Sequence, residues 1–411
     1  MEFQQWCNRH LLVILLTGSF LFVIVSGIFF LTMRSKTAMT ENAEPFSSVP
    51  TENSVVKPLH ISTPNPIRGI YITGWVASQI NMRDELIAFV KKSEINSVVI
   101  DVKDYTGNVL YNTGDPLIQQ WQSEKPRIMD LKEWIESLHN QGIYTIARIT
   151  VFQDPNYSEK QPSQAVLTKT NALWRDRNGL TYIDPSSKPF WEYIVRIAKE
   201  CEQIGFDELN FDYIRFPSDG NMTNIKTPVT HQIEFSGITK NIGIKELALK
   251  EFFSYLRNEL KMVGVPISAD VFGMTLTNKD GLGIGQILEI TAEYFDYICP
   301  MIYPSHWPKH FLGFSNPANH PYEIVHYSMS KGIERLTSIG MNPHKLRPWL
   351  QDFNLGATYD EAKVTSQKKA LYDTGLNSWL MWDPRNRYTR TAYQKQPSHS
   401  PTENEMVKTK T

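Results

Sequence analysis

Short apolar runs alternate with amphipathic helical stretches from residue 66 to residue 392 of the chain. Buried parallel strands are continuous runs of branched apolar residues, whereas helices that cover a sheet show apolar residues at three- and four-residue spacing. The runs predict eight strands, at Arg68–Gly74, Ser97–Val102, Tyr144–Thr150, Glu208–Tyr213, Ile267–Val271, Tyr297–Tyr303, Leu346–Gln351 and Asn377–Trp382.

Helical periodicity fills the intervals between most of these strands, and several of the helices stop at a glycine. Asp130 is expected to cap one of them, because a side-chain oxygen there can accept from a free backbone N–H. This alternation favours an α/β fold of the (β/α)₈ TIM-barrel type over an open doubly wound sheet. The helices are expected at Arg83–Glu94, Leu131–Gln141, Phe190–Ile204, Lys245–Val263, Tyr322–Ile339 and Asp360–Asp373.

An uncharged apolar stretch, Leu11–Leu31, precedes the predicted barrel. As a helix it would be roughly 31 Å long, enough to cross a bilayer. Its length and the poor cleavage site after it favour an uncleaved transmembrane anchor at 11–33 over a signal peptide. Basic residues on both sides specify the orientation weakly and slightly favour a barrel inside the cell. We expect a single-pass membrane anchor.

The remaining segments complete the domain organisation. Residues 1–10 form a short N-terminal segment, and the Ser-, Thr- and Pro-rich residues 34–65 are expected to be a flexible linker. The single predicted domain spans 66–392, and the polar residues 393–411 are expected to be a disordered tail.

Composition excludes several classes of function. The formal net charge of -1 argues against a nucleic-acid-binding protein, for which a basic surplus is expected. The three cysteines, Cys7, Cys201 and Cys299, are too far apart for a metal or redox motif, so free structural thiols are expected. The sequence has no zinc-ligand pattern, no serine-nucleophile elbow, no phosphate-binding loop and no dinucleotide fingerprint, so no cofactor or metal is expected.

Two predicted strands end in a carboxylate, Asp212 in the fourth and Asp270 in the fifth. The carboxyl ends of barrel strands form one face, where two acids can divide the work of cleaving a glycosidic bond. The sequence leaves a structural alternative open for each: Asp212 can pair with Arg215, and Asp270 can cap the loop before Gly273. We expect catalysis from both acids, with Asp212 as nucleophile and Asp270 as general acid/base. Two short Asp side chains favour the wider carboxylate separation of inverting enzymes.

Other polar and aromatic residues at the same strand ends are candidates for substrate binding. Structural alternatives remain for most of them: Asp101 and Lys103 can pair with each other, and Tyr303 and Trp382 can belong to the core. The candidates are Trp75, Asp101, Lys103, Arg215, Tyr303, His306, Asp352 and Trp382.

Five ordered segments resemble a bacterial family of TIM-barrel domains classed as glycoside hydrolases of unknown substrate and distantly related to the α-amylase-like clan. The resemblance covers nearly all of residues 66–390. The segments are Arg68-Gly-Ile-Tyr-Ile-Thr-Gly-Trp75, Val99-Ile-Asp-Val-Lys-Asp104, Asn210-Phe-Asp-Tyr-Ile-Arg-Phe-Pro217, Ser268-Ala-Asp-Val-Phe-Gly273 and Cys299-Pro-Met-Ile-Tyr-Pro-Ser-His306.

The resemblance implies a glycosidase barrel with the presumed catalytic pair on strands four and five. By analogy with the clan, Asp212 corresponds to the nucleophile, Asp270 to the proton donor and Asp352 to a stabilising carboxylate. The sequence departs from the clan at Asp270, because the usual donor on strand five is Glu. The expected function is hydrolysis of a cell-envelope polysaccharide or exopolysaccharide by a membrane-anchored enzyme, and the alternative is a non-catalytic glycan-binding barrel that acts as an envelope scaffold. Because a domain that cleaves such saccharides would face outward, we expect an extracytoplasmic barrel despite the flanking charges.

Overall fold

The computed structural model describes residues 58–121, 126–233 and 242–394. The predicted anchor at 11–33, the segment 1–10, residues 34–57 of the linker and the tail from residue 395 lie outside the described residues. Within the described ranges, no helix is both long enough and apolar enough to cross a membrane.

Eight parallel strands close into a barrel in the order β1-β10-β9-β8-β7-β5-β3-β2, which confirms the predicted (β/α)₈ barrel and all eight predicted strands. The observed bounds differ from the predicted ones by a few residues at most. The barrel strands are β1 (Arg68–Ile72), β2 (Ser97–Lys103), β3 (Tyr144–Thr150), β5 (Glu208–Asp212), β7 (Ile267–Phe272), β8 (Tyr297–Ile302), β9 (Trp349–Gln351) and β10 (Trp379–Trp382).

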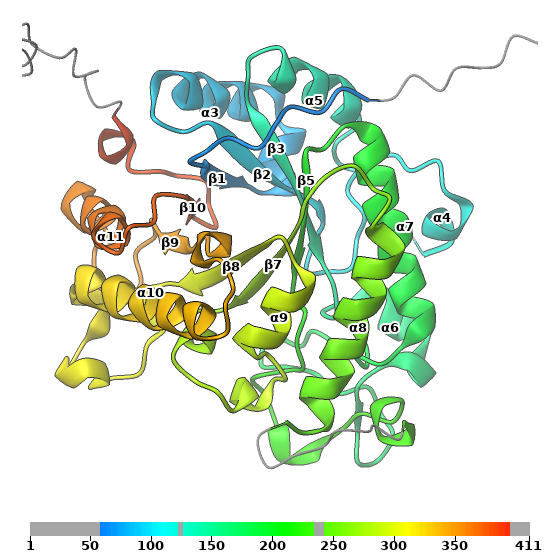
Figure 1. Cartoon of the computed structure of the whole chain (residues 1–411). Helices are drawn as coiled ribbons and strands as arrows, with labels where there is room; N and C mark the ends of the chain where they lie inside the picture. The colour runs from blue at the N-terminus through cyan, green and yellow to red at the C-terminus, as the bar shows by residue number, and fades with distance from the viewer. Residues whose placement is uncertain (1–57, 122–125, 234–241, 395–411) are drawn as a thin grey trace, which may run out of the picture. The chain divides into compact units, whose positions relative to one another are not determined.

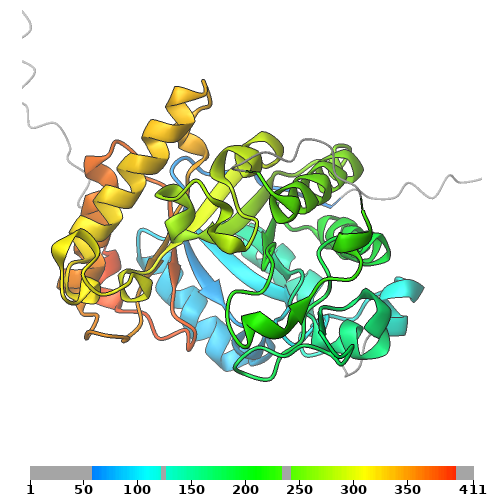
Figure 2. The same cartoon turned by 90° about the horizontal axis from the view of Figure 1, so that it is seen from below.

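Helices surround the strands, and all six predicted helices are present (Figure 1). In both views, α7 and α8 (green) lie on one side of the strands, and α10 and α11 (yellow and orange) lie on the other (Figure 2). The helices are α2 (Gly74–Ser78), α3 (Ile80–Lys92), α4 (Pro116–Trp121), α5 (Leu131–His139), α6 (Pro155–Lys160), α7 (Lys188–Ile204), α8 (Ile244–Leu260), α9 (Leu288–Tyr294), α10 (Pro321–Ser338) and α11 (Glu361–Asp373).

The ends of two helices show how local sequence sets these bounds. Gly205 ends α7 with a left-handed backbone at φ 119°, which a side chain would oppose. Asp130 precedes α5 as predicted, but its side chain does not cap the helix. It forms an ion pair with Arg83 of α3 instead, because a guanidinium offers two charge-assisted hydrogen bonds. The capping role predicted for Asp130 is therefore wrong.

A small antiparallel sheet outside the barrel links the long connections that follow β3 and β5. It pairs β4 (Leu167–Thr168) with β6 (Ile225–Lys226), and strands of two residues leave no periodic signal in a sequence. Trp174 of the first connection donates its indole N–H to the Asn221 carbonyl of the second at 3.0 Å. Gly220 allows the two connections to approach each other there, because a Cβ at this position would lie 2.8 Å from the Trp174 ring.

The barrel interior holds an ion pair between Arg347, just before β9, and Glu208 at the start of β5. Nη1 of Arg347 lies 2.9 Å from each Glu208 oxygen, and both side chains are almost completely buried. The Tyr144 hydroxyl donates to the same carboxylate at 3.2 Å. A buried pair of this kind is tolerated because each charge is matched and hydrogen-bonded.

Breaking this pair is expected to destabilise the barrel. In Glu208→Gln, the Arg347 charge stays buried without its counter-ion, so the free energy of unfolding should fall by about 3–5 kcal/mol. Urea denaturation followed by far-UV circular dichroism measures the loss. The double variant Glu208→Gln/Arg347→Met also removes the unpaired Arg347 charge and should recover part of the lost free energy of unfolding. A single variant as stable as wild type would contradict this role of the pair.

Candidate active site

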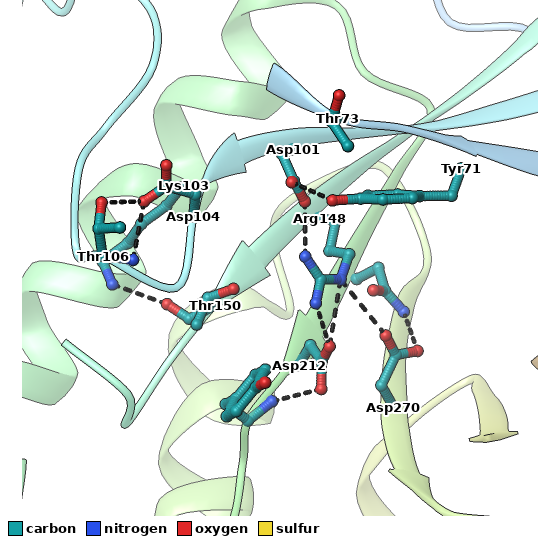
Figure 3. Close-up of polar contacts among 12 residues, drawn as sticks. Tyr71, Thr73, Asp101, Lys103, Asp104, Thr106, Arg148, Thr150, Asp212 and Asp270 are labelled. Carbon is teal, nitrogen blue, oxygen red and sulfur yellow. Dashed lines mark hydrogen bonds and ion pairs between the residues drawn. The ribbon is translucent and has the colours of Figure 1, made fainter. Parts of the chain in front are cut away.

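The guanidinium of Arg148, on β3, binds carboxylates from three other barrel strands (Figure 3). Its Nη1 donates to Asp101 Oδ1 of β2 at 2.6 Å. Nε donates to Asp212 Oδ2 of β5 at 3.1 Å, and Nη2 donates to the same oxygen. Asp270 Oδ2 of β7 lies 3.8 Å from Nε. The two acids predicted to be catalytic therefore meet at one cation inside the barrel.

Strand register explains why these side chains meet. Asp101 is the register partner of Arg148 across β2 and β3, and Arg148 is the partner of Asn210 across β3 and β5. Side chains two residues apart share one face of a strand, so Asp212 faces the same side as Asn210. Polar residues at these positions end apolar strands, which places them at the carboxyl end of the barrel.

Asp270 is held in a defined orientation within an almost completely buried setting. Its Oδ1 accepts from Asn210 Nδ2 at 2.9 Å and from Trp349 Nε1 at 2.8 Å. Burial and then the negative charge of Asp212 raise its pKa well above the usual value, against the opposing effects of Arg148 and the two hydrogen bonds. Asp270 is thus suited to keep its proton near neutral pH.

Asp101 carries the third carboxylate of the cluster. Its Oδ2 accepts from the Tyr71 hydroxyl, and burial raises its pKa even though Arg148 and Tyr71 favour the ionised form. One guanidinium cannot neutralise three buried carboxylates, so a proton on at least one of them lowers the cost of burying the cluster. The arrangement therefore favours unequal protonation of the acids around Arg148.

The shared contacts with Arg148 also limit how far apart the two predicted catalytic acids lie. Asp212 Oδ2 and Asp270 Oδ2 lie 3.1 and 3.8 Å from the same nitrogen. These two oxygens are therefore no more than about 7 Å apart, a bound that is compatible with the retaining separation and with the lower end of the inverting one.

Tyr213 gives the chain a sharp turn directly after Asp212. Its φ of 53° lies in the left-handed region, which is unfavourable for a residue with a side chain. In this conformation the Tyr213 N–H donates to Asp212 Oδ1 at 2.5 Å. The turn thus supplies a hydrogen bond to the Asp212 oxygen that accepts no bond from Arg148.

The acids open onto a cavity of about 350 Å³ whose wall is largely aromatic and apolar. Trp382 stacks on Tyr71 with ring centroids 3.8 Å apart, and Arg148 lies 5.1 Å from a Trp382 ring centroid. Flat aromatic faces beside carboxylates are typical of sites that bind sugar rings. The lining residues are Arg148, Asp212, Tyr213, Arg215, Asp270, Phe272, Gly273, Met274, Met301, Tyr303, His306, Trp307 and Trp382.

Six of the ten predicted site residues therefore line one cavity. A seventh, Asp101, does not line it but forms an ion pair with Arg148, which does. Tyr303 lies close enough to the acid pair that burial, followed by the charges of Asp270 and Asp212, raises its pKa. Desolvation lowers the pKa of His306. The six are Asp212, Asp270, Arg215, Tyr303, His306 and Trp382.

Lys103 does not reach the cavity, which corrects the prediction that it binds substrate. The register between β2 and β3 shifts between Asp101 and Lys103, and such a bulge turns a strand's following side chains to the other face. Lys103 instead forms a fully buried ion pair with Asp154 at 2.8 Å and donates to the Thr150 carbonyl at 2.7 Å. Asp101 and Lys103 are therefore not an internal pair either.

Asp352 and Trp75 also lie outside the cavity lining. Asp352 accepts from the Thr389 N–H at 2.8 Å, the Thr389 hydroxyl at 2.7 Å and the Tyr393 hydroxyl at 2.6 Å. Burial raises the pKa of Asp352 to about 6. These bonds fasten the segment after β10 to the barrel, so the stabilising role implied by the clan analogy has no support in this geometry. Trp75 lies on α2 with 59% of its surface exposed.

Arg215 lines the cavity without contacting Asp212, so the pair that was left open as a structural alternative for Asp212 is absent. Its Nη1 donates to the Phe216 carbonyl and the Ser218 hydroxyl, both at 3.1 Å. The cation beside Asp212 is Arg148, to which the sequence analysis assigned no role. The available signal was an arginine inside a strand of otherwise small and apolar residues, where a charge requires a partner.

The remaining contributors leave weaker signals in the sequence. Tyr71, Asn210 and Trp349 each touch one of the acids or stack beside them, yet each is an ordinary residue for a barrel core. Within the described ranges, no group of three or more His, Cys, Asp or Glu side chains is arranged to hold a metal ion. Cys201 and Cys299 are free and buried, as expected.

Comparison with known proteins agrees with this geometry. Residues 69–388 match the family described as "Putative glycosyl hydrolase domain", and the chain belongs to that family. No curated protein matches the chain.

Several solved structures are similar to the chain. The glycoside hydrolase domain of PgaB (BpsB) from Bordetella bronchiseptica is 13% identical, with a TM-score of 0.58 over 81% of this chain and 100% of that domain. Alpha-L-fucosidase isoenzyme 2 from Paenibacillus thiaminolyticus is 11% identical, with a TM-score of 0.51 over 80% of this chain and 48% of that one. A hypothetical protein from Ruminiclostridium thermocellum ATCC 27405 is 32% identical, with a TM-score of 0.42 over 49% of this chain and 97% of that one. At 11–13% identity, the first two similarities establish the shared fold alone.

Replacing Arg148 is expected to change the protonation of the acids around it. Arg148→Met removes the charge that favours ionised Asp101 and Asp270, so their carboxyls should titrate at a pH about 1–3 units higher. Carboxyl-¹³C NMR of aspartate-labelled full-length protein measures this change, and single Asp→Asn variants assign the signals. Arg148→Lys keeps a positive charge and should shift the titrations less. Identical titration curves in wild type and Arg148→Met would show that this cation does not control the cluster.

Proposed function

We propose that this protein hydrolyses a glycan, with Asp212 and Asp270 as its catalytic acids. The observation that carries the proposal is the difference between the two carboxylates at the base of one aromatic cavity. Asp212 is bound by a guanidinium, whereas burial and the neighbouring charge raise the pKa of Asp270. Acid/base cleavage of a glycosidic bond requires such a pair, one acid ionised and the other protonated.

In the proposed reaction, Asp270 donates its proton to the leaving-group oxygen of the glycosidic bond. Its hydrogen bonds from Asn210 and Trp349 occupy Oδ1, so Oδ2 is the oxygen free to carry and deliver that proton. Asp212, on the neighbouring strand, acts on the sugar as nucleophile or activates the attacking water. Rigid strands hold both groups, which keeps their relative positions more exact than loops would.

The cavity wall is expected to position the sugar. Trp382, Tyr303 and Trp307 supply aromatic surface next to the acids, and sugar rings bind such surfaces through their apolar C–H faces. A barrel that only bound glycans would keep this wall without requiring a proton on Asp270. Family membership and the shared fold support glycan hydrolysis at this general level.

We also propose that the enzyme is a single-pass membrane protein with an extracytoplasmic barrel that acts on a cell-envelope polysaccharide or exopolysaccharide. The support is the uncharged apolar stretch Leu11–Leu31, followed by a linker rich in Ser, Thr and Pro. Such a tether would keep the active site near glycans at the membrane surface.

Substitution of either acid should abolish most activity without unfolding the barrel. Asp212→Asn and Asp270→Asn are each expected to lower kcat by about 10²–10⁴-fold, because each removes one half of the acid/base pair. The assay measures new reducing ends after the full-length chain is incubated with cell-wall and exopolysaccharide fragments. Asp104→Asn, which alters a loop carboxylate just after β2 outside the cavity, should retain wild-type turnover. Near-wild-type turnover in a folded Asp212 or Asp270 variant would remove that residue from the mechanism.

The proposed anchor predicts how the full-length chain fractionates. It should stay with membranes after a carbonate wash and keep an N-terminal tag, because a spanning helix resists extraction. A variant that lacks residues 11–33 should appear in the soluble fraction. Release of a shortened wild-type chain without its tag would instead indicate a cleaved signal peptide.

A further inference from the structure

Arg215 presents a buried positive charge to the cavity without a matching negative charge. Its side chain is 7% exposed, and its Nη1 is used by the Phe216 carbonyl and the Ser218 hydroxyl. Within the described ranges, Nε and Nη2 have no hydrogen-bond partner, and no carboxylate lies within ion-pair distance. A largely buried cation is costly unless its free N–H groups find acceptors, and a ligand in the cavity can supply them.

Two aromatic rings hold this guanidinium in place. Its central carbon lies 4.9 Å from the ring centroid of Tyr213 and 4.7 Å from that of Phe272. Both rings line the cavity, so Arg215 is fixed before any ligand arrives. The free Nε–Nη2 edge offers two parallel N–H groups, which match the two oxygens of a carboxylate.

The other cationic groups in the cavity wall cannot take this role. Arg148 donates from Nη1 to Asp101 and from both Nε and Nη2 to Asp212, so each of its three nitrogens already binds a carboxylate and its charge is compensated within the protein. Desolvation lowers the pKa of His306, which leaves its ring neutral near neutral pH. Among the described lining residues, Arg215 is therefore the permanent cation available to a ligand.

We propose that Arg215 binds the carboxylate of an acidic sugar, so the substrate is a glycan that contains uronic acid or another carboxylate-bearing residue. The inference rests on the proposed glycan hydrolysis and names its substrate class. A neutral sugar would leave the Arg215 charge buried with only hydroxyl partners. Asp212 accepts two hydrogen bonds from Arg148, and burial together with the Asp212 charge raises the pKa of Asp270, which favours its uncharged form. A carboxylate ligand therefore meets less negative charge than three ionised acids would present.

Binding measurements with matched glycans test this assignment. The probes are oligosaccharides of hyaluronan and polygalacturonate and muramic-acid-containing peptidoglycan fragments, each compared with its carboxyl-reduced form. Calorimetry uses the full-length Asp270→Asn variant, so that cleavage does not interfere. At least one native probe should bind about tenfold or more tightly than its reduced form.

Variants of Arg215 should remove this preference. In the Asp270→Asn background, Arg215→Gln should bind the native and reduced forms equally, and Arg215→Lys should keep part of the difference because it retains charge without the fork. Arg196→Gln on α7 removes the same charge from a side chain that is 42% exposed and should leave both affinities unchanged. If Arg215→Gln does not fold, the comparison of native and carboxyl-reduced glycans in the Asp270→Asn variant still tests whether the site prefers a carboxylate.

The possible outcomes separate this inference from the proposed function. Equal binding of native and carboxyl-reduced forms of every probe would overturn the inference, as would cleavage confined to neutral glycans, which still supports glycan hydrolysis. A preference for sulfated over carboxylated glycans would overturn the carboxylate assignment. Selective binding of acidic glycans, with no cleavage by wild type, would support the Arg215 site and contradict the proposed hydrolysis.

Discussion

The ion cluster around Arg148 is the interaction on which the candidate active site depends. A guanidinium inside a barrel is stable only if its charge is matched by well-placed acceptors, and Asp101 and Asp212 provide them from the strands on both sides. The same cluster raises the pKa of Asp270, because a further negative charge beside Asp212 is almost completely buried and has little compensation. The ion pairs of Arg148 thus link neighbouring strands, and the same arrangement of charges favours the protonated form of Asp270.

The barrel places charges at two levels of its interior. Near the amino ends of the strands, Arg347 and Glu208 form a closed pair with one charge of each sign. At the carboxyl ends, Arg148 faces three acids, so the charges there do not balance. The first arrangement gives stability with no reactive group left over. The second leaves a surplus of carboxylates, two of which, Asp101 and Asp270, have pKa values raised by burial, and such shifted groups cluster at functional sites.

Most of the fold could be predicted from the sequence, because each barrel strand is a buried apolar run and parallel strands bring their carboxyl ends together. The same rule brought Asp212 and Asp270 to one cavity without knowledge of any contact. The partner of Asp212 could not be found in this way. Arg148 lies 64 residues before it in the chain, whereas the nearby Arg215 turned out to bind its own loop. A local sequence pattern favours a partner that is close in the chain, whereas the register of the barrel strands places Arg148 beside Asp212.

Lys103 and Asp352 show how contacts between distant segments override what a local sequence pattern predicts. Lys103 follows Asp101 at the two-residue spacing of a shared face, but a register shift after Asp101 turns it to a partner outside the barrel. Asp352 follows a barrel strand directly, as a site residue would, but its carboxylate accepts hydrogen bonds from the hydroxyls of Thr389 and Tyr393. Both errors arise from contacts between segments distant in the chain, which only the folded barrel specifies.

The site divides its work between two kinds of structure. Strands carry Asp101, Arg148, Asp212 and Asp270, whose relative positions are fixed by the register of the barrel. Arg215 lies on the connection after β5, beyond the strained turn at Tyr213. Loop residues can change without altering the register of strands, so the group that would choose the substrate is separable from the groups that would cleave it. Related barrels can therefore keep one acid pair and differ in the charge of the sugar that they accept.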